Sequence, residues 1–360
     1  MLNDYFNTYQ PDLLNLYARK GICFFALRSP GGGIRAGASL SVGEGLVPNS
    51  FLFSPFLNAG KRPRSILPQL SLADIALLPE SDIYKYKGVA AIESTDFAQY
   101  ASGVSAIIDY HRQHGGKTVY SRIISDKCSE MNLDGLFSHL RELYPGSTIF
   151  CFGSPESGIW IGATPELLLR KTDSGLETMS LAGTREAGAS GDWDAKNREE
   201  QQLVTDFIVR VLEESGFEVN HSALNPITRN AGPVEHLCTP IMAVAPAIAN
   251  TVCLNETNIE ALLQKLSPTP ALCGSDRAAS LRLISTYESH DRGCYGGYFG
   301  IVDGDGSFDL YVNLRSMRIY SDGCYTIYVG GGITSLSDFK AEWAETSRKS
   351  EVMLRALGRL

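Results

Sequence analysis

The chain has 360 residues, of which 44% are hydrophobic and 20% are charged, so it can build a large core as one big domain or as two domains of average size. Its 32 lysines and arginines against 40 aspartates and glutamates give a net charge of -8, and no basic run is longer than KRPR at residues 61–64. This charge offers no footprint for a phosphate backbone, so nucleic acid is not expected as a partner.

The eight cysteines are scattered, with no C-x-x-C pair and no histidine at metal spacing. This pattern predicts neither a zinc site nor a disulfide framework, and it is typical of reduced core thiols in a cytoplasmic protein. The N-terminus has no unbroken apolar segment before a cleavage site, and nowhere do about 18 apolar residues run together. We therefore expect neither a signal peptide nor a membrane span.

The first 95 residues predict a helix from Leu2 to Arg19, a strand GICFFALRS at 21–29 and a glycine-rich turn SPGGGIRAG at 29–37. The turn resembles a phosphate loop. It lacks the G-K-[ST] ending and a following helix pattern, so we interpret it as a turn only.

From Asp96 onward the pattern becomes regular, because apolar residues recur at helical spacing up to His111 and HGG then supplies a C-terminal stop. The following elements are predicted in order: a strand at 117–125, a helix from Leu133 to Leu143, strands at 147–155 and 158–165, further β structure at 165–188, and a long helix from about Trp193 to Glu214 closed by Gly216.

The C-terminal part predicts an antiparallel meander: a strand at 296–302, the turn DGDG, a strand at 307–320, the turn SDG and a strand at 324–333. DGDG resembles the start of a calcium loop, but Leu314 stands where the closing glutamate would be, so calcium is not expected. Helices interspersed with antiparallel strands predict an α+β fold, a single large domain with antiparallel sheets packed against helices.

The last predicted helix, DFKAEWAETSRKSEVML at 338–354, carries charges on its apolar face. At 3.6 residues per turn, Glu342 and Lys349 project into the stripe that contains Trp343 and Met353, and Glu345 lies at its edge. Charged groups on a face that should be buried need partners.

A second carboxylate points inward from the long helix at 194–215, where Glu200 lies on the stripe of Val204 and Ile208. One acid near a helix N-terminus can be explained by the helix dipole. Two inward carboxylates from separate helices need a cation or hydrogen-bond donors. Mg²⁺ fits, because it accepts one or two protein carboxylates and leaves positions for water and an anionic substrate.

Other residues have suitable chemistry, each with an ordinary alternative. Lys117 starts a strand, where a lysine is usually solvated, and Arg315 lies within a predicted strand, where an arginine usually snorkels or pairs. Glu166 follows a proline at a strand start, where a salt bridge is the ordinary interpretation. The glycines of VGGGIT at 329–334 present bare backbone, which allows close approach by a ligand.

Ten motifs occur in the order seen in chorismate-utilising enzymes, and the set resembles the isochorismate synthases most closely. They are KTVYSR, GATPELLL, SLAGTREAG, KNREEQQLV, VEHL, LSPTPALCG, YGGYFGIV, VNLRSM, YVGGGI and EWAETSRKSEVM. The resemblance covers roughly Lys117 to Leu360. It implies a divergent N-terminal part of the fold at 1–95 and a chorismate-binding catalytic region at 96–360, in one continuous domain.

The resemblance implies a Mg²⁺-dependent, reversible conversion of chorismate to isochorismate. Water adds to ring carbon C2 while the hydroxyl at C4 leaves. By motif position, Lys117 is the general base for the water and Glu166 is the general acid for the departing hydroxyl. Glu166 must then keep its proton, so we expect an apolar or anionic setting that raises its pKa.

The resemblance also assigns ligands. Glu200 and Glu345 are expected to hold Mg²⁺, with Glu342 beside it as a ligand or as the neighbour of one. The pyruvyl carboxylate is expected to be bound by Arg315, Lys349 and the backbone of Gly330 and Gly332. The rest of the substrate-binding set is His236, Ala182, Gly183 and Thr269.

Relatives of this kind make anthranilate or aminodeoxychorismate with ammonia, or carry isochorismate on to salicylate. The ending LSPTPALCGSD differs from the SGAPK type of the aminating and salicylate-forming relatives, and Ala182 excludes the lysine nucleophile of aminodeoxychorismate synthases. Salicylate synthase is the closest alternative, followed by an aminating subunit and a non-catalytic chorismate-binding protein. Ser267 and Gln201 stand where a histidine is common. We expect a monomer without a glutaminase subunit, serving menaquinone, siderophore or salicylate synthesis.

Overall fold

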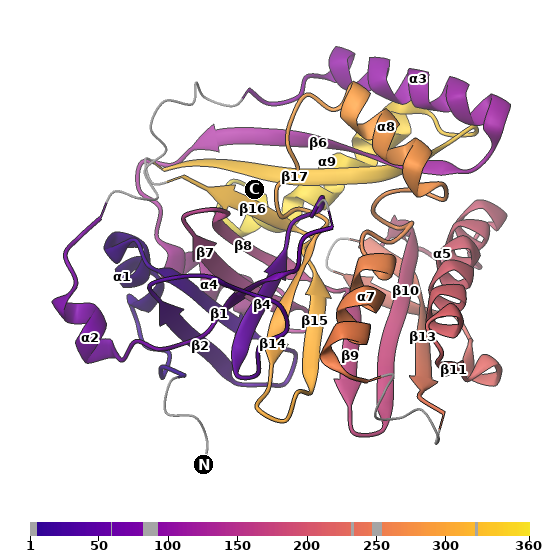
Figure 1. Ribbon diagram of the computed structural model, residues 1–360. Coiled ribbons are helices and arrows are strands. Elements are labelled where there is room, and N and C mark those ends of the chain that lie inside the picture. Colours follow the sequence, from indigo (N-terminus) through magenta and orange to yellow (C-terminus); the bar gives the residue numbers. More distant parts are fainter. Residues whose placement is uncertain (1–5, 59, 82–92, 232–233, 247–253, 321–322) are drawn as a thin grey trace.

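The computed structural model describes residues 6–58, 60–81, 93–231, 234–246, 254–320 and 323–360. In this part of the chain, two large antiparallel sheets pack face to face, and helices cover their outer faces (Figure 1). No helix among the described residues is both long and apolar enough to cross a membrane.

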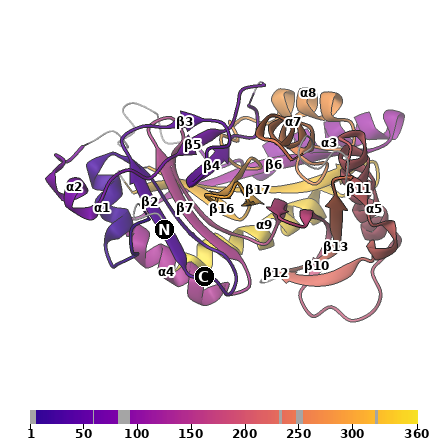
Figure 2. The ribbon, with the colours of Figure 1, turned by 60° about the horizontal axis from the view of Figure 1, so that its bottom comes forward.

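One sheet has seven strands. Their order is β2 (Ile34–Ser39), β1 (Cys23–Arg28), β7 (Thr148–Ser154), β8 (Gly158–Thr164), β16 (Ser316–Ile319), β17 (Cys324–Thr334) and β6 (Lys117–Lys127). Apolar residues of α1 (Leu13–Lys20), α4 (Leu133–Leu143) and α9 (Phe339–Ala356) share a buried cluster with its outer face. The helix α3 (Phe97–His114) packs near the β6 edge. Figure 2 shows β6 and β17 lying between α9 and α8 (Arg277–Tyr287).

The other sheet has ten strands. They are β11 (Glu218–Val219), β13 (Val234–Val244), β10 (Gly175–Glu186), β9 (Leu167–Thr172), β15 (Phe308–Val312), β14 (Tyr298–Val302), β4 (Ser50–Ser54), β5 (Arg64–Ile66) and β3 (Gly43–Glu44), with β12 (Ile227–Ala231) paired to β13. The helices α5 (Ala195–Glu214) and α7 (Glu256–Leu266) share a buried cluster with this sheet. The short helix α2 (Leu72–Leu77) and the 3₁₀ turn His221–Ala223 complete the described elements.

Aromatic side chains fill the space between the sheets. Phe25 on β1 stacks on Phe51 of β4 with ring centroids 4.8 Å apart, and Phe150 on β7 contacts Phe299 of β14 at 4.0 Å. These four rings belong to one buried cluster, to which strands of both sheets contribute. Large buried rings of this kind contribute much of the hydrophobic stabilisation of a core.

The chain passes between the two sheets at two adjacent places. It leaves β8 for β9 through Pro165 and Glu166, and it leaves β15 for β16 through residues 313–315. The two crossing segments are hydrogen-bonded, because Val312 N donates to Glu166 O at 3.0 Å and Ala163 N donates to Arg315 O at 3.1 Å. Arg315 has a φ of 49°, a left-handed conformation that is uncommon for arginine.

The helix predicted from Leu133 to Leu143 is confirmed at both ends, and the helix predicted from Asp96 is confirmed as Phe97–His114. The long helix starts at Ala195 instead of Trp193, because Asp194 is its N-cap and accepts a hydrogen bond from Asn197 N.

Two predictions are wrong. The N-terminal helix begins only at Leu13, after Pro11 and a left-handed Asp12 with a φ of 67°, and residues 2–5 of the predicted range lie outside the described residues. The predicted continuous strand at 307–320 is two strands in different sheets, because the backbone reverses at Arg315. Ser321 and Asp322 of the predicted SDG turn also lie outside the described residues.

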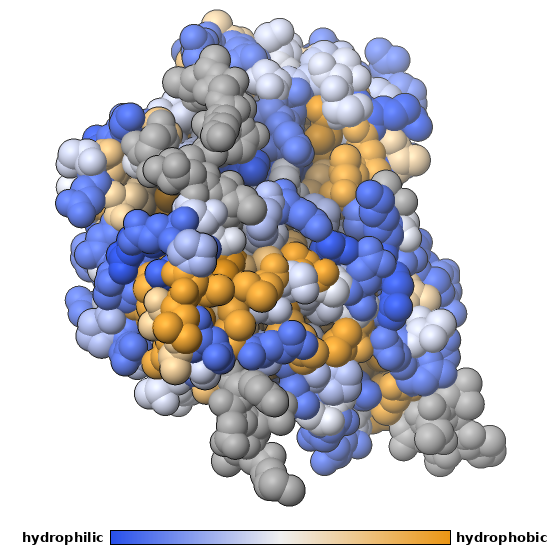
Figure 3. All heavy atoms as spheres, turned by 60° about the vertical axis from the view of Figure 1, so that its left-hand side comes forward, coloured by the Kyte–Doolittle hydropathy of each residue, from blue (hydrophilic) through white to orange (hydrophobic). Residues whose placement is uncertain are grey.

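Some large apolar side chains remain exposed on the N-terminal elements. Leu77 on α2 is 87% exposed, and Leu40 after β2 is 65% exposed. Figure 3, in which the left-hand side of Figure 1 comes forward, shows apolar surface gathered on this face. Exposed apolar side chains are ordinary on globular proteins, so we assign this face no function.

Candidate active site

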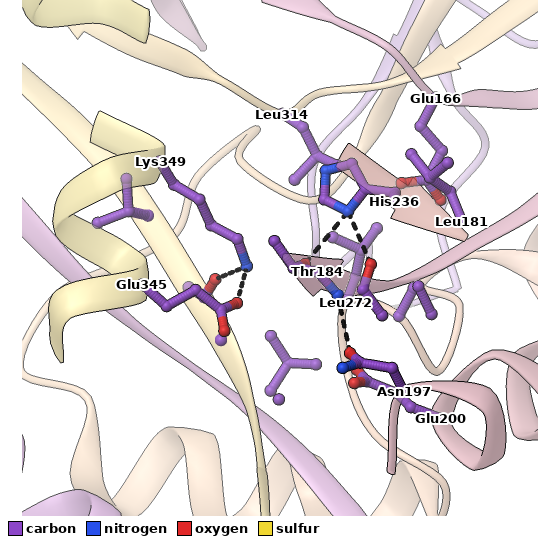
Figure 4. A pocket seen from close by; sticks show the side chains of 18 of the residues that line it. Glu166, Leu181, Thr184, Asn197, Glu200, His236, Leu272, Leu314, Glu345 and Lys349 are labelled. Atoms are coloured by element: carbon purple, nitrogen blue, oxygen red, sulfur yellow. Dashed lines mark hydrogen bonds and ion pairs between the residues drawn. The ribbon is translucent and has the colours of Figure 1, made fainter. Parts of the chain in front are cut away.

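A cavity of about 190 Å³ lies where the two sheets meet, between β17 and α9 on one side and β10, β13 and α5 on the other (Figure 4). The two crossing segments complete its wall, since Glu166 and Arg315 both line it. Residues far apart in the sequence are thus brought together by the sheet topology.

Glu166 is almost fully buried, with 3% of its surface exposed. Burial raises its pKa to about 8, although Lys117, Arg229 and Arg315 act in the opposite direction. A buried carboxyl group keeps its proton because the charged form loses its hydration. Burial therefore favours the protonated form, which is the form that the expected role of a general acid needs.

Arg315 presents a positive charge to the same cavity. Its Nη2 donates to Nε2 of His236 at 3.0 Å, whereas its buried Nη1 has no hydrogen-bond partner among the described residues. Burial lowers the pKa of Arg315, but an arginine keeps its charge in a protein. A buried guanidinium with an unpaired donor indicates a site for an anionic ligand.

Lys117 and Glu200 form an ion pair at the cavity edge. Lys117 Nζ donates to Glu200 Oε1 at 2.6 Å, and the lysine is 1% exposed. The backbone of Lys117 is fixed independently, because its N–H donates to Ser275 Oγ at 3.0 Å and its carbonyl accepts from Ser275 N. Glu200 on α5 therefore does turn inward, and its partner in this structure is the amine of Lys117.

Two carboxylates from α9 enter the cavity from the other side, as Figure 4 shows for Glu345. Lys349 Nζ donates to Glu345 Oε1 at 2.6 Å and to Gly330 O at 3.0 Å. Burial and the neighbouring Glu345 raise the pKa of Glu342 to about 7. Burial alone would also raise the pKa of Glu345, but Lys349 outweighs it and lowers that pKa.

The glycines of β17 let these carboxylates approach the backbone. A Cβ atom at Gly331 would lie 2.9 Å from Glu342 Oε2, and one at Gly332 would lie 2.9 Å from Glu200 Oε1. Such distances are too short for a real side chain, so only glycine leaves this space open. Carboxylates from α5 and α9 consequently converge on two adjacent residues of one strand.

The donor set fits a hard divalent cation. Within the described part of the chain, no three histidine, cysteine, aspartate or glutamate side chains form a ready-made metal group. Mg²⁺ does not require such a cage, since it uses one or two carboxylates together with water and substrate oxygens. Glu200, Glu342 and Glu345 line one cavity, and the repulsion between the last two is a reason for a cation to bind there.

Most of the sequence-predicted residues line this one cavity. They are Glu166, Ala182, Gly183, Glu200, His236, Arg315, Gly330, Gly332, Glu342, Glu345 and Lys349. Lys117 is not part of the lining and lies behind Glu200, with Nζ 3.5 Å from the Cβ position of Gly332. Thr269 is also not part of it: its side chain is buried, and the neighbouring Ala271 and Leu272 line the cavity instead.

Sequence reasoning missed several lining residues. Tyr295, Tyr328, Thr184 and Asn197 all face the cavity. Asn197 lies three residues before Glu200 on α5, so helical spacing would have placed the two side chains on one face. Tyr328 carries no such signal, because an aromatic residue in a strand usually indicates core, and Tyr295 lies in a turn before β14.

A family model described as chorismate binding enzyme matches residues 56–358. The chain belongs to this family of chorismate binding enzymes. Isochorismate synthase EntC of Escherichia coli (strain K12) is 31% identical over 278 residues, which cover 74% of this chain and 68% of the relative. The salicylate biosynthesis isochorismate synthase of Pseudomonas aeruginosa is 32% identical over 270 residues, which cover 72% of this chain and 54% of that relative.

A solved structure extends the likeness across almost the whole chain. MenF, the menaquinone-specific isochorismate synthase from Escherichia coli, superimposes with a TM-score of 0.75 at 21% identity, over 95% of this chain and 90% of that one. At this identity the likeness shows the fold. The α+β fold predicted for this chorismate binding enzyme is confirmed, as is the resemblance drawn from its motifs.

Proposed function

We propose that this chorismate binding enzyme is an isochorismate synthase that converts chorismate to isochorismate reversibly with Mg²⁺. One observation carries the proposal: the paired crossing segments place a neutral buried acid, Glu166, and a buried arginine with a free donor, Arg315, in the wall of one cavity. The relatives named above support it.

Substrate recognition follows from the charges of the cavity. Chorismate has two carboxylates. Arg315 and Lys349, with the backbone of Gly330 and Gly332, would bind the pyruvyl carboxylate through charge-assisted hydrogen bonds. Two separated anchors fix the ring relative to the reacting groups.

The second anchor would be the metal, held by Glu200 and Glu345 with Glu342 beside them. When bound, Mg²⁺ would neutralise the ring carboxylate and hold it in place. The carboxylates of these residues face Gly331 and Gly332, so this end of the cavity is the acidic one.

The reaction needs one base and one acid. Lys117 in its neutral form would take a proton from water, whose oxygen bonds to C2 while the double bonds shift and the C4–oxygen bond breaks. Glu166 would give its proton to the departing hydroxyl, which leaves as water. Because Lys117 donates to Glu200 in this structure, Glu200 must give up this ion pair before Lys117 can act as the base.

Two other reactions of chorismate are weaker candidates. Salicylate synthase would require elimination of pyruvate after the same first step. An aminating reaction would require ammonia, and Ala182, which lines the cavity, brings no amine. We propose water as the nucleophile and no glutaminase subunit.

Chromatography of the products formed from chorismate tests the function. We expect isochorismate when Mg²⁺ is present, and the reverse reaction when isochorismate is supplied. Ammonium should leave the products unchanged. Salicylate or anthranilate as the main product would assign the chain to another reaction of this family.

The metal requirement is tested in the same assay with excess EDTA. We expect turnover to stop and to return when Mg²⁺ is restored, because the ring carboxylate then regains its counter-ion. Undiminished turnover in EDTA would contradict the metal assignment.

A further inference from the structure

His236 lines the cavity, yet both of its ring nitrogens are engaged by the protein. Nε2 lies 3.0 Å from Arg315 Nη2, and Nδ1 lies 3.0 Å from Gly183 O and 3.2 Å from Thr184 Oγ1. The ring therefore has no nitrogen to offer a substrate. Its contacts indicate a role that differs from the substrate contact expected from the sequence.

The two principal partners of His236 require the same tautomer. An arginine has only donors, so Nε2 must accept from Arg315 and carries no proton. A carbonyl oxygen has only lone pairs, so Nδ1 must carry the proton and donate it to Gly183 O. The ring is thus neutral, and its orientation is fixed from both ends.

The carbonyl of Gly183 points at the histidine because of an irregularity in β10. The register between β10 and β13 shifts between Ala182 and Thr184, and Gly183 has a φ of 57°. A bulge of this kind turns a backbone group out of the regular ladder. A Cβ at this position would also lie 3.2 Å from Asn197 Cβ.

Two amide side chains of α5 hold the irregular segment in place. Gln201 Oε1 accepts from Ala182 N at 2.9 Å, and Asn197 Oδ1 accepts from Thr184 N at 3.0 Å. Gln201 is buried, and its Nε2 donates to Ser180 Oγ and Thr239 Oγ1 at 2.7 and 3.0 Å. Both backbone N–H groups that flank Gly183 are therefore satisfied by the same helix.

We propose that His236 and Gln201 are positioning residues for Arg315: α5 fixes the irregular segment, the Gly183 carbonyl fixes the tautomer of His236, and His236 Nε2 aims the guanidinium so that Nη1 remains free for a substrate carboxylate. The inference rests on the proposed function for the identity of that carboxylate. Burial and the charge of Arg315 hold the pKa of His236 far below its usual value, which keeps Nε2 unprotonated.

The first test compares two substitutions of His236. In His236→Asn the amide can still donate to Gly183 O, but no atom remains at the place of Nε2. In His236→Gln the side chain reaches that place, where Oε1 can accept from Arg315. We expect His236→Asn to raise the KM and the calorimetric Kd for chorismate about 10- to 100-fold with a smaller change in kcat, and His236→Gln to restore most of this loss.

A double-mutant comparison separates positioning from direct contact. If His236 acts through Arg315, then His236→Asn changes the Kd for chorismate by less than about threefold once Arg315→Lys is present. The same loss in both backgrounds, or a fall confined to kcat, would overturn the inference. Gln201→Met, which removes the contact to Ala182 N, should raise KM in the same direction.

A measurement on the wild-type protein keeps the inference testable if a variant does not fold. In ¹⁵N NMR spectra of histidine-labelled protein, His236 should show a protonated Nδ1 and a bare Nε2. A proton on Nε2 would contradict the proposal. This result does not depend on turnover, so absence of isochorismate in the assay contradicts the proposed function without deciding the role of His236.

Discussion

The protonation of Glu166 is decided by where the chain places it. Exposed at a strand start it would be an ordinary carboxylate, but at the crossing between the sheets it is buried and its pKa rises to about 8. Lys117 lies nearby, in an ion pair with Glu200. The buried acid thus lies in the cavity wall, whereas the amine lies behind Glu200 and outside the lining.

Glu166→Gln should remove the acidic proton without changing the shape of the side chain. We expect kcat to fall about 100- to 10,000-fold, since a carboxamide cannot donate this proton, while the Kd for chorismate changes little. Steady-state kinetics and calorimetry measure the two quantities. Glu199→Gln, on the exposed side of α5, is the matched control and should behave as wild type.

The same group predicts a pH dependence. In the wild type, kcat/KM should fall as the pH rises through about 8, because Glu166 then loses its proton. The free energy of unfolding should fall over a lower pH range, between the ordinary value of 4.5 and the folded value of about 8. In this range the folded state holds the proton and the unfolded state has released it, so each pH unit removes up to about 1.4 kcal/mol, and the loss ends above about 8. Urea unfolding at several pH values in this range measures the free energy of unfolding. Its change with pH should be smaller for Glu166→Gln than for the wild type.

At the scale of elements, β17 matters because two of its glycines leave room for carboxylates to approach its backbone. Gly331 and Gly332 are paired to β6 in regular register, and the side chains that approach them come from α5 and α9. An ordinary side chain at either position would collide with one of these carboxylates. Gly331 and Gly332 therefore leave room for the site at a cost to the sheet, which glycine generally weakens.

Gly332→Ala tests this function of the strand. The new Cβ would lie 2.9 Å from Glu200 Oε1, so the carboxylate must move and its ion pair with Lys117 must change. We expect kcat to fall about 10- to 100-fold with little loss of thermal stability, because the displaced atom is the end of a flexible side chain. Gly146→Ala, where a Cβ meets nothing within 4 Å, is the control. Equal activity of both variants would contradict this view of β17.

At the scale of the molecule, the cavity joins the two sheets. The chain passes from one sheet to the other at Arg315. Across the cavity, β17 and α9 face β10 and α5. A substrate held from both sides would bind only the folded arrangement. Binding should therefore oppose unfolding of the whole domain.

Chorismate with Mg²⁺ should raise the thermal midpoint by about 3 to 4 °C when the ligand is at about 100 times its Kd, the effect of roughly 2.7 kcal/mol on a chain of this length. Differential scanning calorimetry measures it. Arg315→Ala should remove most of the shift, and Gly146→Ala should keep it. An unchanged shift in Arg315→Ala would show that this arginine does not hold the substrate.

The sequence by itself determined the elements with strong periodicity and the residues with distinctive motifs. The helices containing Glu200 and Glu345 were predictable because 3.6-residue spacing places a charge on a face whether or not the neighbouring element is known. The sequence also predicted that Glu200 and Glu345 turn inward, and both line the cavity, whereas a common metal partner for them stays a prediction.

Only the tertiary structure decided how these residues meet. The residues from 307 to 320 have continuous β character, so nothing in them signals the left-handed turn at Arg315 that divides the segment between two sheets. The ion pair of Lys117 with Glu200, and the contact of His236 with Arg315, join segments about 80 residues apart. The local sequence pattern indicates on which face of its helix or strand a side chain lies. The residue that this side chain contacts depends on how the two sheets pack together.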